Sequence, residues 1–163
     1  MYGGLCAFSE GENDNPYYLL AKQKPSPYSD DFTMEYFKDL LTSIQPLKTS
    51  AKAFLATEQR IPGLGNGVLQ DILYKAWIHP KTKISTLLVE QLHYLYQVIK
   101  KTLLQNEKGG RDTEKDLFGQ PGGYKTKLSK KTVGTKCPKC WELIIKAYLS
   151  GSIYYCTGCQ KVS

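Results

Sequence analysis

The sequence lacks any run of about 18 apolar residues, the length that a helix needs to cross a bilayer. Its first residues, Met1-Tyr2-Gly3-Gly4, also lack the charged and then apolar segments of a secretory signal peptide. The first absence excludes a membrane-spanning helix. The second predicts a protein that stays in the cytoplasm.

Acidic residues are scarce in the C-terminal part of the chain. Residues 100–163 hold 13 Lys and Arg against 5 Asp and Glu, whereas residues 1–99 hold 9 against 10, within a formal net charge of +7. A basic surplus confined to one part of the chain predicts a polyanionic partner, nucleic acid first and an anionic membrane surface second. A basic face that is simply solvated is the alternative.

Cysteine is rare, but four of the five cysteines form two C-x2-C pairs separated by fifteen residues. Two such pairs supply the four thiolates of a tetrahedral, structural zinc site. The predicted ligands of one Zn²⁺ are Cys137, Cys140, Cys156 and Cys159. Disulfides are the alternative, and the missing secretory signal disfavours them. Between the pairs, Ile144-Ile145 and Ile153-Tyr155 flank Ser150-Gly151 and predict a hairpin, which the metal would hold together because a lone hairpin is marginal in water. Cys6 is expected to be a small buried residue.

Apolar residues at helical spacing predict a helical core between residues 32 and 106. The predicted helices are 32–44 capped by Asp31, 50–58, 67–78 capped by Asn66, and a long helix to about 105 capped by Ser85. Asp71 and Lys75 are predicted to form an exposed pair on the third helix. In the long helix, Leu88, Leu92, Leu95, Ile99 and Leu103 are expected to face inward.

The two ends of this core differ from it in pattern. Residues 1–28 contain two apolar patches, Leu5–Phe8 and Tyr17–Ala21, which predict a strand pair that either packs on the helices or is the remnant of a larger β domain. Residues 107–136 mix glycines with lysines and predict a mobile, basic connection. The expected fold class is therefore mainly α, with a C-terminal four-cysteine zinc β-hairpin and a short N-terminal strand pair.

A glycine-rich turn, Ile61-Pro62-Gly63-Leu64-Gly65-Asn66-Gly67, precedes the third predicted helix. Glycines let the main chain approach a ligand closely, and the first amides of a helix can bind a phosphate oxygen. Phosphate contacts at helix starts, supplemented by lysines, register proteins on a duplex without reading its sequence. A tight helix–helix turn without a ligand is the alternative.

These segments together resemble the C-terminal half of the formamidopyrimidine-DNA glycosylase / endonuclease VIII family. The resemblance covers about residues 32–163 and is carried by motifs in a fixed order: Gln59 to Asn66 opening a helix, Ile78-His79-Pro80, Gly109-Gly110, Gln120 to Tyr124, the four cysteines, and Cys159-Gln160-Lys161. It implies a helix-two-turn-helix domain at 32–106, a flexible basic loop at 107–136 and a zinc finger at 137–161. Residues 1–28 resemble the last strands of an upstream β-sandwich domain.

The resemblance also implies binding residues and a partner, damaged double-stranded DNA. Asn66 matches an asparagine that binds the phosphate beside the damaged nucleotide, Gly65 belongs to the same turn, and Lys52 matches a basic residue facing the DNA backbone. The segment Leu117 to Lys125, with Tyr124 and Lys125 as candidate DNA contacts, corresponds to a loop that closes over an everted base. A solvated linker is the alternative for this loop. A monomer without a nucleotide cofactor or a membrane partner is expected.

The chain departs from the family pattern in two places. The family's nucleophile is an N-terminal proline followed by a glutamate, and this chain begins Met1-Tyr2, so no catalytic residue is expected here and the chain is expected to be an inactive fragment of a longer DNA glycosylase/AP lyase. Gly151 stands where many members carry an arginine at the hairpin tip, and the interval between the cysteine pairs is one residue shorter. Lys146 could supply a charge from the neighbouring strand, without arginine's bidentate fork.

Three functions fit this sequence. The favoured one is the DNA-binding portion of a base-excision DNA glycosylase/AP lyase. A non-enzymatic DNA-binding sensor on the same scaffold would use the same residues, and borohydride trapping on abasic-site DNA would separate the two. An RNA-binding protein of ribosomal type is the third, and the four-cysteine hairpin argues against it.

Overall fold

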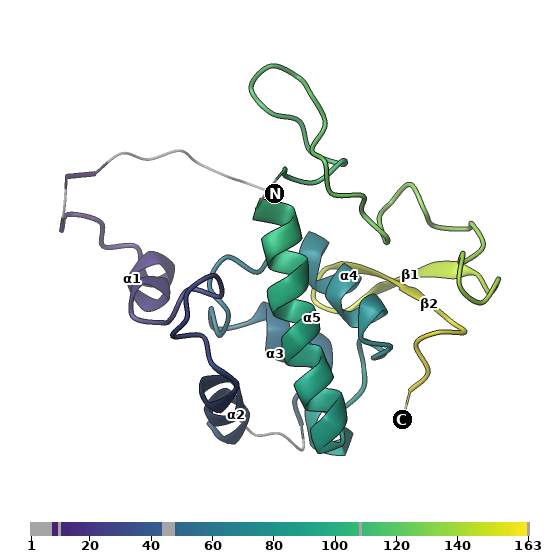
Figure 1. The fold of residues 1–163 in the computed structure, drawn as a ribbon, viewed down its shortest axis with the longest axis horizontal. Helices are drawn as coiled ribbons and strands as arrows, with labels where there is room; N and C mark the ends of the chain where they lie inside the picture. The colour runs from purple at the N-terminus through teal and green to yellow at the C-terminus, as the bar shows by residue number, and fades with distance from the viewer. Residues whose placement is uncertain (1–7, 10, 44–47, 108, 163) are drawn as a thin grey trace.

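The computed structural model describes residues 8–9, 11–43, 48–107 and 109–162. The fold is mainly helical with one antiparallel hairpin, as expected (Figure 1). The elements in chain order are α1 (Pro16–Lys22), α2 (Met34–Thr42), α3 (Ala51–Ala56), α4 (Asn66–Lys75), the short 3-10 helix η1 (Ile84–Thr86), α5 (Val89–Glu107), β1 (Ile144–Tyr148) and β2 (Ser152–Cys156). The helix α5 runs along the front of α3 and α4 in Figure 1, and the hairpin lies beside α4.

Aromatic and aliphatic side chains from four helical segments make the main core. Its fully buried members include Phe32, Phe37, Phe54, Leu69, Ile72, Leu73, Leu95 and Ile99. The predicted inward positions Leu95, Ile99 and Leu103 of α5 are buried, and Leu92 is partly buried against the same cluster. Periodic apolar spacing therefore identified the packed faces of these helices correctly.

Three predicted helix starts are wrong in detail. Thr33, rather than Asp31, caps α2, because its hydroxyl accepts the Tyr36 amide at the N-cap position. Ser85 lies in η1, and α5 begins at Val89, so Leu88 precedes the helix and is 65% exposed rather than packed inward. Asn66 is the first residue of α4 rather than its cap.

The cap position of α4 belongs to Gly65, whose carbonyl accepts hydrogen bonds from the amides of Val68 and Leu69. No side chain caps this helix. The Asn66 side chain therefore makes no capping hydrogen bond, and it is exposed at the start of the helix.

The predicted N-terminal strand at Tyr17–Ala21 is a helix. The Asn15 side chain accepts hydrogen bonds from the amides of Tyr17 and Tyr18, and Pro16 occupies the first helical turn. This asparagine cap with a following proline starts α1 and overrides the strand-like apolar run. The other half of the predicted strand pair, Leu5 to Ala7, and the predicted buried Cys6 lie outside the described residues.

The predicted hairpin is present. In the register of β1 and β2, Ile144 pairs with Cys156 and Tyr148 with Ser152. A three-residue loop, 149–151, joins the strands, and both Ser150 and Gly151 have positive φ angles. Ile144 and its partner Cys156 are buried on one face of the hairpin, and Ile153 is buried on the other, so both faces pack against the protein.

No helix in the described part of the chain combines the length and the apolar character that crossing a membrane requires.

Candidate nucleic-acid interface and metal centre

Two consecutive turns join α3 to α4. The Arg60 amide donates to the Thr57 carbonyl, and the Leu64 amide donates to the Ile61 carbonyl. The guanidinium of Arg60, which is 7% exposed, donates to the Ala53 carbonyl and the Thr57 hydroxyl and so covers the end of α3. The junction is therefore a rigid two-turn connection between two helices.

The hairpin tip is attached to this junction. The Lys52 ammonium, 5% exposed on α3, donates to the carbonyls of Leu149 and Ser150, and burial lowers the pKa of Lys52. A β carbon added to Gly151 would lie 3.5 Å from Asn66 Nδ2. The glycine-bearing helix junction and the tip of the cysteine-bearing hairpin, which are far apart in sequence, thus meet at one place.

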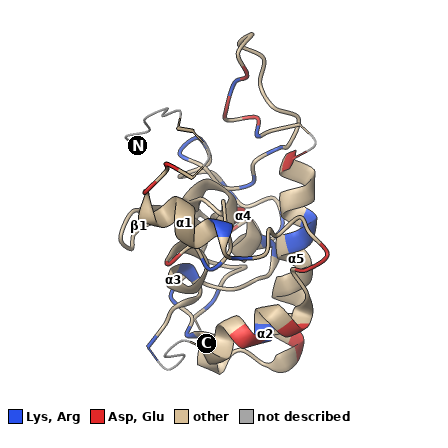
Figure 2. Ribbon diagram, turned by 90° about the vertical axis from the view of Figure 1, so that its left-hand side faces the viewer, with Lys and Arg blue, Asp and Glu red and all other residues tan. Residues whose placement is uncertain are grey.

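A basic cavity of about 800 Å³ lies where these elements meet. Its lining includes four lysines, Lys48, Lys52, Lys81 and Lys83, together with Gly65, Asn66 and the tip residues Leu149 and Ser150. Among the described residues, no acidic side chain lines it. Within the described residues, the amides of Asn66 and Gly67 have no hydrogen-bond acceptor, so the positive end of α4 opens here. Figure 2 shows a basic position on α3, whereas α2 and α5 each carry both basic and acidic positions. The cavity is suited to an anion.

The other predicted DNA contacts lie elsewhere. Tyr124 is 8% exposed, and its hydroxyl donates to the Asp71 carboxylate. Lys125 lines a different cavity, next to α5. Lys146 is exposed on β1 opposite Tyr154 and lines neither cavity. The structure brings together Lys52, Gly65 and Asn66 and leaves the other three apart.

The predicted exposed pair of Asp71 and Lys75 is wrong. Asp71 is fully buried and accepts hydrogen bonds from the Tyr124 hydroxyl at 2.9 Å and from the amides of Lys127 and Leu128 at 2.9 and 2.8 Å. Burial raises the pKa of this carboxyl, and the three hydrogen bonds act in the opposite direction. Asp71 therefore anchors residues 124–128, which belong to the connection that the glycines and lysines predicted to be mobile.

Gln70, the neighbour of Asp71, makes a second buried link. Its Nε2 donates to the Leu128 carbonyl at 2.7 Å, and its Oε1 accepts the amide of Tyr154 on β2. One feature of the sequence indicates that Gln70 and Asp71 are buried, because apolar residues occupy most other positions of α4. A helix that is apolar nearly all round is buried, and polar residues inside it need partners.

Arg111 is a further residue that the sequence reasoning missed. Its side chain is 12% exposed, forms an ion pair with Glu114, and packs against Gly67, where a β carbon would lie 2.1 Å from the Arg111 Nη1 atom. Gly67 therefore makes room for an arginine next to Asn66. A glycine inside a helix lowers helix stability by about 1 kcal/mol relative to alanine. A glycine at such a position is therefore a sequence signal that a side chain packs closely there.

The connecting segment closes on itself at its glycines. The Gly122 amide donates to the Arg111 carbonyl, and the amides of Gly123 and Tyr124 donate to the carbonyls of Gly109 and Gly110. A β carbon at Gly122 would lie 2.3–2.6 Å from backbone atoms of Gly110 and Arg111, whereas one at Gly123 would have no heavy atom within 4 Å.

We expect Gly122→Ala to separate the two arms of this segment, because main-chain atoms cannot move aside as the end of a flexible side chain can. Hydrogen exchange at the Gly123 and Tyr124 amides should accelerate at least tenfold in this variant. Gly123→Ala is the matched control and should leave the exchange nearly unchanged. Equal exchange in both variants would contradict the close backbone contact.

The four cysteines of the two knuckles form one cluster. Their Sγ atoms all lie within 4.8 Å of one another, with 3.7 Å between Cys137 and Cys159 and 3.3 Å between Cys140 and Cys156. Sulfur ligands of a tetrahedral ion with bonds of about 2.3 Å lie about 3.8 Å apart. All four are free thiols. The donor set and its spacing fit a metal ion.

Polar neighbours prepare the Cys137 sulfur for metal binding, whereas burial raises the pKa of the Cys156 and Cys159 thiols. Burial acts to raise the pKa of Cys137, but the Tyr74 hydroxyl, 3.1 Å away, and the amides of Lys139 and Cys140 bring it down to about 6. Metal ligation requires the thiolate. Gln160, 1% exposed, joins this end of the hairpin to the segment that follows α4, since its Nε2 donates to the Ile78 carbonyl and its Oε1 accepts the Cys156 amide.

Comparison with known proteins decides the family. The family described as "Formamidopyrimidine-DNA glycosylase H2TH domain" matches residues 24–116, more than half of the chain. This chain belongs to the formamidopyrimidine-DNA glycosylase family. The glycosylase of Bacillus cereus is 29% identical over 98% of this chain, and that of Escherichia coli is 32% identical over 93%. The chain spans 58% and 55% of the lengths of these curated relatives.

Solved structures of the family match as well. A Lactococcus lactis Fpg in complex with abasic-site DNA has a TM-score of 0.74 at 27% identity, covering 90% of this chain and 54% of that one. A Lactococcus lactis Fpg mutant in complex with DNA containing Fapy-dG gives 0.75 at 27% identity with the same coverage. The MutM (FPG) protein of Thermus thermophilus gives 0.79 at 23% identity, covering 94% and 59%, which shows the shared fold.

Proposed function

We propose that this chain is the DNA-binding portion of a base-excision DNA glycosylase/AP lyase and that it binds damaged duplex DNA. The observation that carries the proposal is the meeting of the two-turn junction and the hairpin tip in one cavity with four lysines and no acidic lining. The two free amides of α4 and the exposed Asn66 carboxamide would bind a DNA phosphate there. The matching Lactococcus lactis Fpg structures are complexes with abasic-site DNA and with DNA containing Fapy-dG, which supports the same partner.

Each predicted contact has a stated role in this proposal. Asn66 and Gly65 would hold the phosphate, and Lys52 would act mainly by fixing the hairpin tip, because its ammonium already donates to the tip carbonyls. Lys48, Lys81 and Lys83 would add charge around the same phosphate. Lys125 and Lys146, both exposed, would contact DNA only outside this cavity, and Tyr124 would act by holding the segment before Lys125.

We further propose that the four cysteines bind one structural zinc ion, since paired thiolates at tetrahedral spacing favour it. The proposed division of the chain has a helical domain at 32–106, a basic connection at 107–136 and a zinc finger at 137–161. The connection is anchored at Tyr124 to Leu128 by Asp71, so any movement would be confined to the residues before this anchor.

We expect Asn66→Ala to weaken duplex binding about tenfold at moderate salt, because it removes a phosphate contact, roughly 1.4 kcal/mol of binding free energy. Its melting temperature should hardly change, since the side chain makes no capping hydrogen bond. A fluorescence titration with abasic-site duplex measures the affinity.

Asn106→Ala is a matched asparagine control outside the cavity and should bind duplex like the parent chain. Unchanged affinity in Asn66→Ala, or an equal loss in both variants, would contradict the phosphate site.

A further inference from the structure

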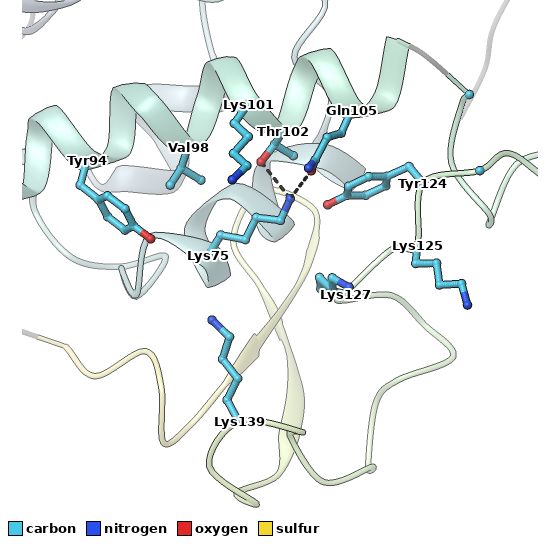
Figure 3. A pocket seen from close by; sticks show the side chains of 12 residues that line it. Lys75, Tyr94, Val98, Lys101, Thr102, Gln105, Tyr124, Lys125, Lys127 and Lys139 are labelled. Carbon is cyan, nitrogen blue, oxygen red and sulfur yellow. Dashed lines mark hydrogen bonds between the residues drawn. The ribbon is translucent and has the colours of Figure 1, made fainter.

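A second basic cavity, of about 710 Å³, lies at the opposite end of α4 (Figure 3). Its walls come from α5, the connecting segment and the first cysteine knuckle. Five lysines are among the lining residues that the structure describes, namely Lys75, Lys101, Lys125, Lys127 and Lys139. None of the described lining residues is acidic. The first cavity contains Asn66, the first residue of α4, and this one contains Lys75, the last, so roughly 14 Å of helix separates them.

Neutral groups hold two of these ammonium groups in place. Lys75 Nζ donates to Thr102 Oγ1 at 3.1 Å and to Gln105 Oε1 at 3.2 Å, and it lies 4.9 Å from the centre of the Tyr124 ring. Lys139 Nζ lies 4.2 Å from the Trp77 ring centre. Figure 3 shows Lys101 and Lys139 pointing toward Lys75 from opposite walls. These contacts orient the charges without neutralising them.

The lysines repel one another. Burial is the main cause of the lowered pKa of Lys75, and the charges of Lys127, Lys101 and Lys139 lower it further, while only the buried Asp71 raises it. The ion pairs in the described part of the chain are Arg60 with Glu58 and Arg111 with Glu114, so none involves a lysine of this cavity. A ligand with several negative charges would relieve this repulsion.

We propose that this cavity binds a compact chain of linked phosphates, as found in a nucleoside triphosphate or in inorganic tripolyphosphate. Lysine ammonium groups bind phosphate oxygens as point charges, and several of them converge here on a short span. The volume lies in the range of about 300–1,000 Å³ that small-ligand sites occupy. The Tyr94 ring, 46% exposed on the wall, offers a surface on which a base can stack.

The test is calorimetric titration of the 163-residue chain with tripolyphosphate, dATP and inorganic phosphate at moderate salt. We expect the first two to bind at least tenfold more tightly than inorganic phosphate. Lys101→Glu/Lys127→Glu should weaken both at least tenfold. The control Lys100→Glu/Lys130→Glu changes the same helix, the same segment and the same net charge outside the cavity, and it should lose less than threefold.

The two ligands distinguish the source of the phosphates. Tighter binding of dATP than of tripolyphosphate supports a nucleotide, and equal binding supports the phosphate chain alone. No binding of either, or an equal loss in the cavity variant and its control, overturns the proposal.

A DNA titration separates this site from the proposed DNA surface. The cavity variant should keep the duplex affinity of its charge-matched control, and Asn66→Ala should keep its tripolyphosphate affinity. If the cavity variant loses tenfold more duplex affinity than its control, the lysines belong to the DNA path and the proposal is wrong. Failure of Asn66→Ala to weaken duplex binding would leave this site intact and count only against the proposed function.

Discussion

Removing the metal ion with a chelator is expected to unfold the β1–β2 hairpin while the helices stay folded. The sulfurs belong to a small buried cluster with Tyr74, Leu128 and Ile144, which is separate from the main core around Phe37. Structural zinc contributes roughly 10–16 kcal/mol in small zinc peptides, and a two-stranded hairpin is marginal without such support. Hydrogen exchange should therefore lose all protection at the β1 and β2 amides, and helical circular dichroism should remain.

Metal analysis of the same protein should find one zinc per chain. Cys137→Ser and Cys159→Ser should each abolish stoichiometric binding, because each removes one of four ligands. Cys6→Ser is the control, since Cys6 belongs to neither C-x2-C pair of the sequence, and it should keep one zinc. A folded hairpin with four titratable thiols and no metal would show that the cysteines serve another purpose.

Asp71→Ala is expected to lower the free energy of unfolding by about 3 kcal/mol or more. The change leaves three buried donors without an acceptor, and each unsatisfied buried donor costs about 1–3 kcal/mol. For a chain of this size the melting temperature should fall by roughly 6–12 °C. Thermal unfolding measures this loss, and hydrogen exchange should show it first at the Leu128 amide.

The loss of unfolding free energy in Asp71→Ala should also depend on pH. Burial raises the pKa of Asp71 above its ordinary value of 3.8, so the folded state holds this proton more tightly than the unfolded state. The contribution of Asp71 to the free energy of unfolding is then fully present below about pH 3.8, and it declines as the pH rises through the folded-state pKa. The destabilisation by Asp71→Ala should therefore be larger at acid than at neutral pH. Asp39→Ala, at an exposed position of α2, should show neither effect. A pH-independent difference would argue against a raised pKa.

Patterns among residues close together in the sequence predicted the local structure well. The spacing of Cys137, Cys140, Cys156 and Cys159 indicates a shared site because each pair fixes two sulfurs within one tight knuckle. The spacing of Leu95, Ile99 and Leu103 indicates the buried face of α5, because helical geometry alone puts them on one stripe. At Tyr17–Ala21 the apolar run predicted a strand, and the Asn15-Pro16 helix start was the better local signal.

Contacts between distant residues could not be predicted in this way. The partners of Asp71 lie more than fifty residues further along the chain, and those of Lys52 lie almost a hundred. An aspartate four residues before a lysine predicts an ion pair on the exposed face of a helix. In the folded chain the connecting segment packs onto α4, and Asp71 accepts hydrogen bonds from Tyr124 and two main-chain amides of that segment instead. The second basic cavity is hidden for the same reason, because its five lysines come from four separate segments.

The anchoring of the hairpin tip has a consequence for substitutions there. Lys52 holds the tip through the carbonyl groups of residues 149 and 150, and every amino acid supplies the same carbonyl. The attachment therefore does not depend on the polar groups of those side chains, and Ser150 can be exchanged for another residue that tolerates a positive φ angle while the ribbon stays beside the junction. Leu149 is less exchangeable, because its side chain also packs against the main core.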